Sequence, residues 1–293
     1  MDSRHSSLGA IGFMLMAVAF FSLMDASMKA LSLHYPSLQV TTLRGAASLP
    51  FVLAWVWGSA GLRSIAPARW SLHLLRGVLG IVMIACFAQA LKSLPLATGY
   101  AIFFVAPLLI TALSVPILKE KVGPRRWAAI GGGLVGVLVV LRPGIDGFIS
   151  IAGLLVLAAA TAYAGGAITV RLLVGTDTSQ AMVVWFLLLM AIGAGVMAAP
   201  GWVPLRWEHA WLIAVMGLTG ALGQMGLTTA FQRGEASLIA PLEYTGLVWV
   251  IAWDWAFWRV LPDWATWLGA GIIIASGLYL LHRESVQRRR SPG

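Results

Sequence analysis

Charged side chains interrupt an apolar stretch near the start of the chain. Asp25 and Lys29 follow the apolar run "GAIGFMLMAVAF" of residues 9–20 and lie four residues apart. On a helix this spacing places both side chains on one face, with the acid N-terminal to the base, which is the better orientation for a pair. A charge at bilayer depth costs roughly a few kcal/mol. Two interpretations stay open: a structural pair with Lys29 extending toward the interface, or a pair that lines a cavity and binds a charged substrate or titrates.

A second acid lies beside a proline in the apolar segment "SLIAPLEYTGLVWVIAWDWAFW", residues 237–258. Glu243 follows Pro241 by two residues, and proline removes a backbone hydrogen bond and loosens a helix. We therefore predict Pro241 as a hinge, and Glu243 with Tyr244 as a substrate or proton site.

The same segment carries Asp254 among several tryptophans toward its outer end. Tryptophans near a membrane interface normally form an aromatic belt. Trp249 lies deeper and is also a candidate for the cavity wall.

The stretch "YAIFFVAP" places Tyr100, Phe103 and Pro107 at positions i, i+3 and i+7 of one helix, with Phe104 between them. Such a stripe serves either for packing or as the wall of a ligand pocket, which is mostly apolar. Pro107 is the predicted hinge here, and Tyr163 in a later segment is a weaker candidate for the same cavity.

The remaining polar candidates are distributed over four segments. Arg44 lies about two turns inside its segment and is a candidate partner of Asp25 or ligand of a substrate carboxylate. Arg171 ends its segment and is expected to act as a topology anchor. Gln89 and Gln224 are candidates for interhelical contact or substrate contact.

Composition defines the environment of these residues. Of 293 residues, 59% are hydrophobic and 11% charged, and the mean hydropathy is +0.86. A soluble protein carries about a quarter of its residues as charged ones, so we predict an all-α, polytopic membrane protein. No cleavable signal peptide is evident, and we expect the first span to direct insertion.

Ten segments have the roughly 20 apolar residues that a membrane-crossing helix needs. Their predicted ranges are 8–31, 37–57, 71–91, 96–117, 125–142, 148–170, 180–199, 209–231, 237–259 and 264–282. Assigning the loops to alternate sides gives thirteen Lys and Arg on one side and four on the other. By the positive-inside rule both termini are predicted to be cytoplasmic, in a multi-pass protein of the cell (inner) membrane.

The chain matches itself at an offset of 140 residues (217 − 77), which pairs Gly77 with Gly217 and Trp127 with Trp267. Earlier, an offset of 142 pairs "MKAL" (28–31) with "VRLL" (170–173). We predict two repeats, 1–143 and 144–293, each with five spans. An odd number of spans inverts the second repeat relative to the first, an arrangement that recurs in secondary transporters with a midplane site.

Taken together these segments resemble the drug/metabolite transporter superfamily, EamA type. The stretch "ALKSLPLATGYAIFFVAPLLITALSVPILKEKVGPRRWAAIGGGLVGVLVVL" (90–141) resembles a characteristic family segment, with Pro107, Glu120 and Gly131 on family positions. "DASMKAL" and "TTLRGAA" resemble the first two family helices. The second half departs from the pattern, because Leu247 and Val260 occupy the positions that match Pro107 and Glu120.

The resemblance implies a ten-helix secondary transporter with cytoplasmic termini and no ATP hydrolysis, and it includes aromatic amino-acid exporters. We expect amino-acid export by alternating access, with uptake or exchange of a nucleoside or vitamin as the alternative. The partners would be a small-molecule substrate and membrane lipids, and no nucleic acid or cofactor is expected. Oligomeric state, direction and proton coupling stay open, and a monomer is compatible.

Other classes lack sequence support. The chain has no G-x-x-x-x-G-K-[ST] loop for ATP. Its one cysteine, Cys86, and its histidines show no metal-ligand spacing. A membrane-embedded enzyme would need clustered acids, histidines or a nucleophile at one interface, and a channel would need a pore loop or acidic ring. No catalytic or metal-binding residue is therefore predicted.

Overall fold

The protein is a bundle of apolar helices in a computed structural model that describes residues 2–59, 61–119, 122–142, 150–233 and 240–290. No β-strand occurs in these ranges. The long helices are α1 (Asp2–Ser32), α2 (Ser37–Ser59), α3 (Trp70–Ala90), α4 (Leu96–Phe103), α5 (Ala106–Leu118), α6 (Pro124–Leu141), α7 (Ile151–Leu173), α8 (Ser179–Ala198), α9 (Ala210–Arg233), α11 (Gly246–Trp253) and α12 (Trp264–Arg290). Short turns are η1 (Leu62–Ile65), η2 (Ala199–Gly201), η3 (Trp207–His209), η4 (Ala240–Thr245) and the π-helical η5 (Asp254–Trp258).

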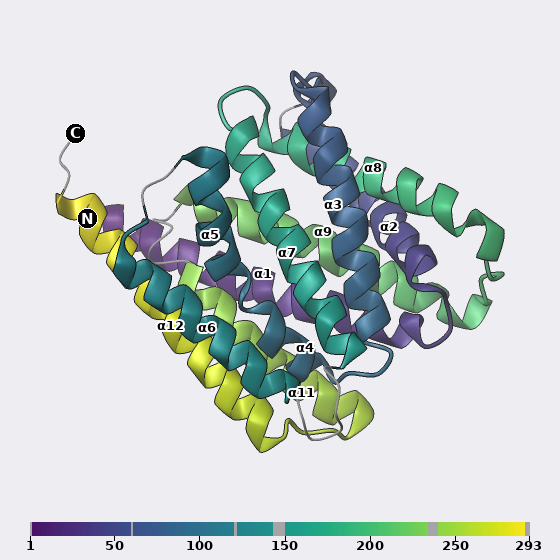
Figure 1. The fold of residues 1–293 in the computed structure, drawn as a ribbon. Helices are drawn as coiled ribbons and strands as arrows, with labels where there is room; N and C mark the ends of the chain where they lie inside the picture. Colours follow the sequence, from purple (N-terminus) through teal and green to yellow (C-terminus); the bar gives the residue numbers. More distant parts are fainter. Residues whose placement is uncertain (1, 60, 120–121, 143–149, 234–239, 291–293) are drawn as a thin grey trace.

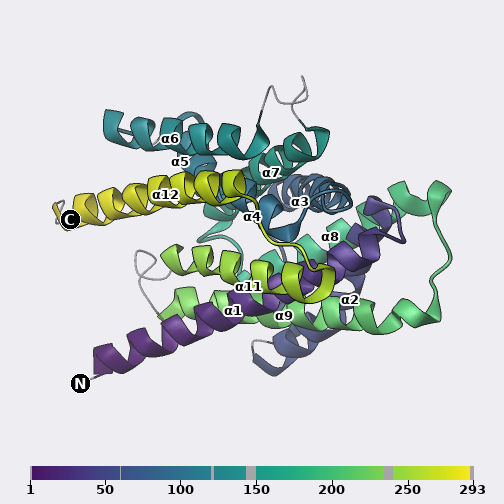
Figure 2. The same cartoon turned by 90° about the horizontal axis from the view of Figure 1, so that it is seen from below.

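Within the described residues, nine segments are long and apolar enough to cross a membrane. They agree with nine of the ten predicted crossings, α4 and α5 together counting as one. The remaining one, the ninth in chain order and predicted as an unbroken helix over 237–259, is instead built from η4, α11 and η5. α1 begins and α12 ends at the same end of the bundle (Figures 1 and 2), as an even number of crossings requires.

The predicted helix over 96–117 is interrupted at Phe104 and Val105. Pro107 occupies the first turn of α5, where a proline fits because the amides there have no helical partner. Its missing N–H removes the hydrogen bond that the Phe103 carbonyl would otherwise accept within a continuous helix. The predicted hinge at Pro107 therefore coincides with a real break in the helix.

The ninth crossing, built from η4, α11 and η5, changes helix type twice. Residues 240–245, which include Pro241, form a 3-10 turn, and the chain then continues as α11 before widening into the π-helical η5. Such irregular backbone at membrane depth is tolerated where it is buried in protein or lines a cavity. The predicted segment's first residues, 237–239, lie outside the described part of the chain, as does Glu120.

Helices pack in pairs that repeat with the two halves exchanged. α1 packs along α9 and α3 along α7, α2 packs on α9 and α3 on α8, and α6 lies beside α12 (Figures 1 and 2). Advancing both members by five crossings, and counting on from the tenth to the first, turns α1 with α9 into α7 with α3 and α2 with α9 into α8 with α3. The pair of α6 with α12 maps onto itself.

Individual glycines show the same exchange. A Cβ on Gly77 would meet Leu189 of α8, and a Cβ on Gly217 would meet Ala47 of α2. Gly77 and Gly217 are 140 residues apart (217 − 77), and Ala47 and Leu189 are 142 apart (189 − 47). The same close contact thus occurs twice, at the two predicted offsets, which supports the interpretation of the halves as repeats. Small residues at such crossings let the helix backbones approach.

Cross-half hydrogen bonds tie the loops together at two places. Tyr35 Oη lies 2.8 Å from His209 Nδ1, and His73 Nε2 lies 3.0 Å from Asp177 Oδ1. Burial raises the pKa of the Asp177 carboxyl, but hydrogen bonds from His73, the Ala68 amide and Thr176 outweigh burial and hold that pKa below its ordinary value. Because the unfolded carboxyl has the higher pKa, this stabilisation is present at neutral pH and is lost as the pH falls through the carboxyl range.

We therefore expect Asp177→Asn to lower the melting temperature of the purified protein at neutral pH, with a gap to wild type that narrows as the pH falls toward about 3 to 4. Differential scanning fluorimetry in detergent measures this. Glu208→Gln is the control, because its ion pair with Arg206 is largely exposed. A gap that stays constant with pH would contradict the role of Asp177.

Candidate functional site

Three polar side chains of α1 face the two interrupted crossings, the fourth (α4 and α5) and the ninth (η4, α11 and η5). Ser22, Asp25 and Lys29 recur at i, i+3 and i+7 and so share one helix face. Ser22 Oγ accepts a hydrogen bond of 3.0 Å from Trp253 Nε1. We call the contacts of these three residues the α1 seam, because they join α1 to α4, α11 and η5.

Lys29 forms a buried ion pair with Asp254, whose side chain lies 225 residues further along the chain. The Nζ–Oδ1 distance is 3.0 Å, and both side chains are almost fully buried. The same ammonium lies 4.4 Å from the ring centroid of Trp258. The predicted pairing of Lys29 with Asp25 is thus wrong. A carboxylate and a ring from η5 neutralise the lysine instead, and it does not extend toward an interface.

Asp254 also completes the beginning of α4. Pro95 precedes that helix and has no side-chain oxygen to accept from the first free amides. Asp254 Oδ2 takes this role by accepting the Ala97 N–H at 2.8 Å. A carboxylate at a helix N-terminus is favourable, so one acid holds α1, α4 and η5 together.

Asp25 has a separate set of partners. The Tyr100 hydroxyl donates to Asp25 Oδ2 at 2.6 Å, and Arg44 of α2 acts electrostatically on the same carboxylate without an ion pair within 4.0 Å among the described residues. The predicted partnership of Arg44 and Asp25 therefore stays a prediction. Asp25 is buried and Arg44 half-buried. Charged residues inside a membrane normally lie near an opposite charge.

Six aromatic rings surround the break between α4 and α5. Phe87 lies 6.3 Å from Tyr100 and 5.5 Å from Phe103, measured between ring centroids. The cluster then divides into two branches, Phe103 to Tyr163 at 5.4 Å and Tyr100 to Phe104 to Tyr244 at 5.8 and 5.1 Å. We call these six residues the aromatic cluster. It brings the predicted Tyr100, Phe103 and Tyr244 together.

A half-buried acid, Glu243, influences two of the cluster's tyrosines. It acts electrostatically on both Tyr163 and Tyr244, and Arg76 of α3 acts on Tyr163. Among the described residues, Glu243 makes no hydrogen bond or ion pair to another side chain. A carboxylate left in this state is available to a ligand or a proton.

Tyr244 has a buried hydroxyl without a hydrogen-bond partner in the described part of the chain. A buried unsatisfied hydroxyl costs about 1–3 kcal/mol, so a native structure keeps one where it has a use. The space for this hydroxyl exists because Gly277 of α12 has no side chain: a Cβ there would collide with it.

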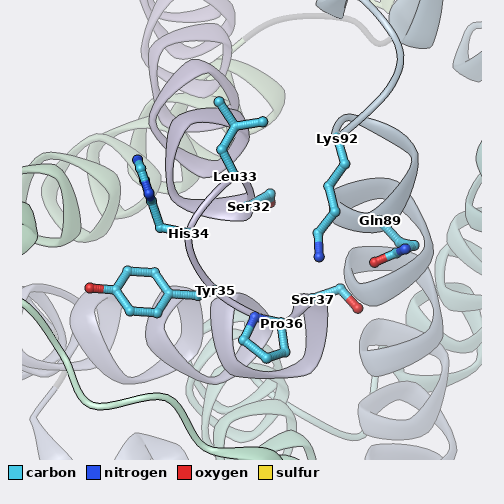
Figure 3. A pocket seen from close by; sticks show the side chains of 8 residues that line it. All are labelled: Ser32, Leu33, His34, Tyr35, Pro36, Ser37, Gln89 and Lys92. Carbon is cyan, nitrogen blue, oxygen red and sulfur yellow. The ribbon is translucent and has the colours of Figure 1, made fainter.

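Other predicted residues lie elsewhere. Gln89 is exposed and lines a pocket of about 350 Å³ at the turn between α1 and α2, with Lys92 on the same side of the pocket (Figure 3). Trp249 is 39% exposed and stacks on Trp253, and Arg171 is exposed at the end of α7. Gln224 is half-buried in α9. The structure does not bring Gln89 or Trp249 to the aromatic cluster.

Sequence reasoning left out Phe87 and Arg76 and treated Phe104 and Asp254 as secondary. Spacing rules find neighbours within one helix, whereas Asp254 meets Lys29 across 225 residues. Charge counting is the signal that was available, because each cation well inside a crossing needs an anionic partner. Within the described residues no three His, Cys, Asp or Glu side chains are placed to hold a metal ion.

An all-helical bundle with paired intramembrane charges, two broken crossings and an aromatic cluster beside an unpaired acid defines a polytopic membrane carrier. The family model of the EamA-like transporter family matches the chain twice, over residues 8–142 and 150–281. The chain belongs to the EamA-like transporter family. It is therefore a transporter of small metabolites, not an enzyme.

Two relatives and one solved structure are similar to the chain over most of its length. It is 29% identical to a riboflavin transporter of Vibrio cholerae, over 99% of this chain and 98% of the relative. It is 26% identical to a pseudopaline exporter of Pseudomonas aeruginosa, over 81% and 83%. A solved crystal structure aligns with a TM-score of 0.62 at 17% identity, over 91% of this chain and 96% of that one, which shows a shared fold. These matches do not include an aromatic amino-acid exporter, so that part of the resemblance stays a prediction.

The α1 seam predicts strong coupling between Lys29 and Asp254. Lys29→Met and Asp254→Asn each leave one buried charge without its partner, which costs about 3–5 kcal/mol. The double variant removes both charges, while the amide oxygen introduced by Asp254→Asn can still accept from the Ala97 N–H. We therefore expect the melting temperature of the double variant to exceed that of either single variant.

The control for this cycle is the exposed pair Arg206 and Glu208, whose coupling should be within about 1 kcal/mol. Melting temperatures of all variants in one detergent give the comparison. Purely additive losses at Lys29 and Asp254 would show that the pair does not bind α1 to η5.

Proposed function

We propose that this protein is a secondary transporter that binds a small metabolite with a flat aromatic ring at the aromatic cluster, and that Glu243 is part of the binding or proton site. The observation that carries the proposal is the position of the half-buried, unpaired Glu243 beside Tyr163 and Tyr244. Ligand pockets combine an apolar wall with a few placed polar groups, which describes this arrangement.

The first compound to test is riboflavin, because its fused ring system suits stacking between aromatic side chains and a relative of nearly equal length carries that name. Aromatic amino acids are the second class to test. The observation that favours them is that Glu243 and Arg76, which carry opposite charges, both act electrostatically on Tyr163, as a zwitterion would require. The alternative of a vitamin substrate thus stands ahead of amino-acid export.

The exchange of contacts between the halves supports alternating access. Two related halves of opposite orientation can swap conformations around a fixed site. The residues proposed for the site come from both predicted halves: Tyr100, Phe103 and Phe104 from the first, and Tyr163, Glu243 and Tyr244 from the second. The breaks at Val105 and near Pro241 place irregular backbone beside the site in both halves.

We predict that liposomes containing the purified protein show saturable uptake or release of labelled riboflavin or an aromatic amino acid, with competition by related compounds. Flux that rises linearly with concentration, without competition, would exclude a carrier. Chemical conversion of the compound would indicate an enzyme instead.

Glu243→Gln should reduce the initial transport rate about tenfold or more, or displace its pH dependence, because the amide keeps the shape but neither carries charge nor accepts a proton. Glu208→Gln, at the exposed Arg206 pair, is the control. Wild-type rates at every pH in Glu243→Gln would remove Glu243 from the site.

A matched glycine pair on α12 tests Tyr244. Gly277→Ala should lower transport strongly, because the new methyl group would collide with the Tyr244 hydroxyl. Gly271→Ala on the same helix should leave transport unchanged, since a Cβ there meets nothing within 4 Å. Equal transport in both variants would contradict a role for Tyr244 in binding.

A further inference from the structure

Among the described residues, six Asp, Glu, Lys or Arg side chains lie well inside the crossings, three acids and three bases. Lys29 forms an ion pair with Asp254, and Arg44 has the Asp25 carboxylate as an electrostatic neighbour. The two that remain are Arg76 of α3, on which no carboxylate acts in this way, and Glu243 of the ninth crossing.

Arg76 makes neutral contacts. Its Nη1 donates to the Met182 carbonyl at 2.7 Å, and the guanidinium lies 4.9 Å from the ring centroid of Phe186. In the described part of the chain no carboxylate lies within 4.0 Å of it. A guanidinium has five N–H donors, and these two contacts leave most of them unused by the described residues.

A cation in this state requires an anionic partner. An ionisable residue inside a membrane is expensive and normally pairs with an opposite charge, and guanidinium groups match carboxylate and phosphate in a two-pronged geometry. Glu243 does not fill the role, because it forms no ion pair with Arg76. The two charges act on Tyr163 without touching each other.

The surroundings of Tyr163 are not fully closed by protein. Tyr163 is half-buried and lies against Phe103 of the aromatic cluster in a tilted ring contact. A Cβ added to Gly166, one turn further along α7, would meet no atom within 4 Å. The Arg76 side chain is likewise half-buried.

We propose that Arg76 is a specificity-determining residue that binds the anionic group, a carboxylate or a phosphate, of the transported aromatic compound. The inference rests on the proposed function and narrows it: the preferred substrate is an aromatic anion or zwitterion, and a neutral aromatic compound of the same shape is a poorer one. The ring lies in the aromatic cluster, and any cationic group of the substrate faces Glu243.

The test compares matched pairs of compounds that differ in one charged group. The pairs are riboflavin 5′-phosphate with riboflavin, and tryptophan with tryptophanamide. Competition against a transported, labelled aromatic compound in liposomes gives the inhibition constant of each. We call riboflavin 5′-phosphate and tryptophan the anionic members, because each carries the phosphate or carboxylate that its partner lacks. Wild type should bind the anionic member of at least one pair about tenfold more tightly than the other member. The pair that shows this preference tells whether the site takes a phosphate or a carboxylate.

Arg76→Gln should reduce this preference to within about twofold, because it should weaken the binding of the anionic member and not that of its partner compound. Arg76→Lys should keep part of the preference. Arg69→Gln is the matched control, because Arg69 also donates to a carbonyl of a neighbouring helix, that of Leu172, but lies outside the aromatic cluster. Its preference should equal that of wild type.

Two results would overturn the proposal: no preference for the anionic member in wild type, or an equal loss for both members in Arg76→Gln. If Arg76→Gln does not fold, loss of part of the preference in folded Arg76→Lys supports the proposal and a full wild-type preference overturns it.

Failure of the proposed function can be distinguished from failure of the proposal for Arg76, because in the first case wild type transports no aromatic compound. Binding is then measured without transport, as the rise in melting temperature that each compound of the same pairs causes in the detergent-solubilised protein. An anion-selective rise in wild type that Arg76→Gln loses supports anion binding, and its absence overturns it.

Discussion

The structure depends on the neutralisation of charge inside an apolar bundle. Lys29 is held by Asp254, and the other oxygen of that carboxylate caps α4. This contact joins α1 to the fourth and ninth crossings, which are not continuous helices in the described residues. The first amides of a helix have no partner within that helix, and here a charged side chain from another crossing accepts one of them, the Ala97 N–H.

The same constraint organises the candidate site. Charges that serve the scaffold have partners of opposite sign, as in the α1 seam, whereas Glu243 and Arg76 are half-buried beside the aromatic cluster without such partners among the described residues. We propose that this difference separates structural charges from charges available to a substrate. The tyrosines contribute to both groups, since Tyr100 binds Asp25 while Glu243 acts electrostatically on Tyr163 and Tyr244.

Sequence patterns were sufficient where the cause is local. Hydropathy located the crossings, and Pro107 marked a real break because a missing amide acts within one turn. The glycine offset anticipated the exchanged contacts of Gly77 and Gly217. Patterns failed where the cause is distant. The four-residue spacing of Asp25 and Lys29 is equally good for a pair and for two separate partnerships, and only the fold decides between them.

The separation of Lys29 from Asp254 also has a consequence for biogenesis. The chain is made from its N-terminus, so α1 must enter the membrane 225 residues before its counter-ion exists. Until then the ammonium has neither its carboxylate nor the ring of Trp258. The contact between Lys29 and Asp254 therefore forms only after the ninth crossing has been made, and a chain that stops before Asp254 lacks it.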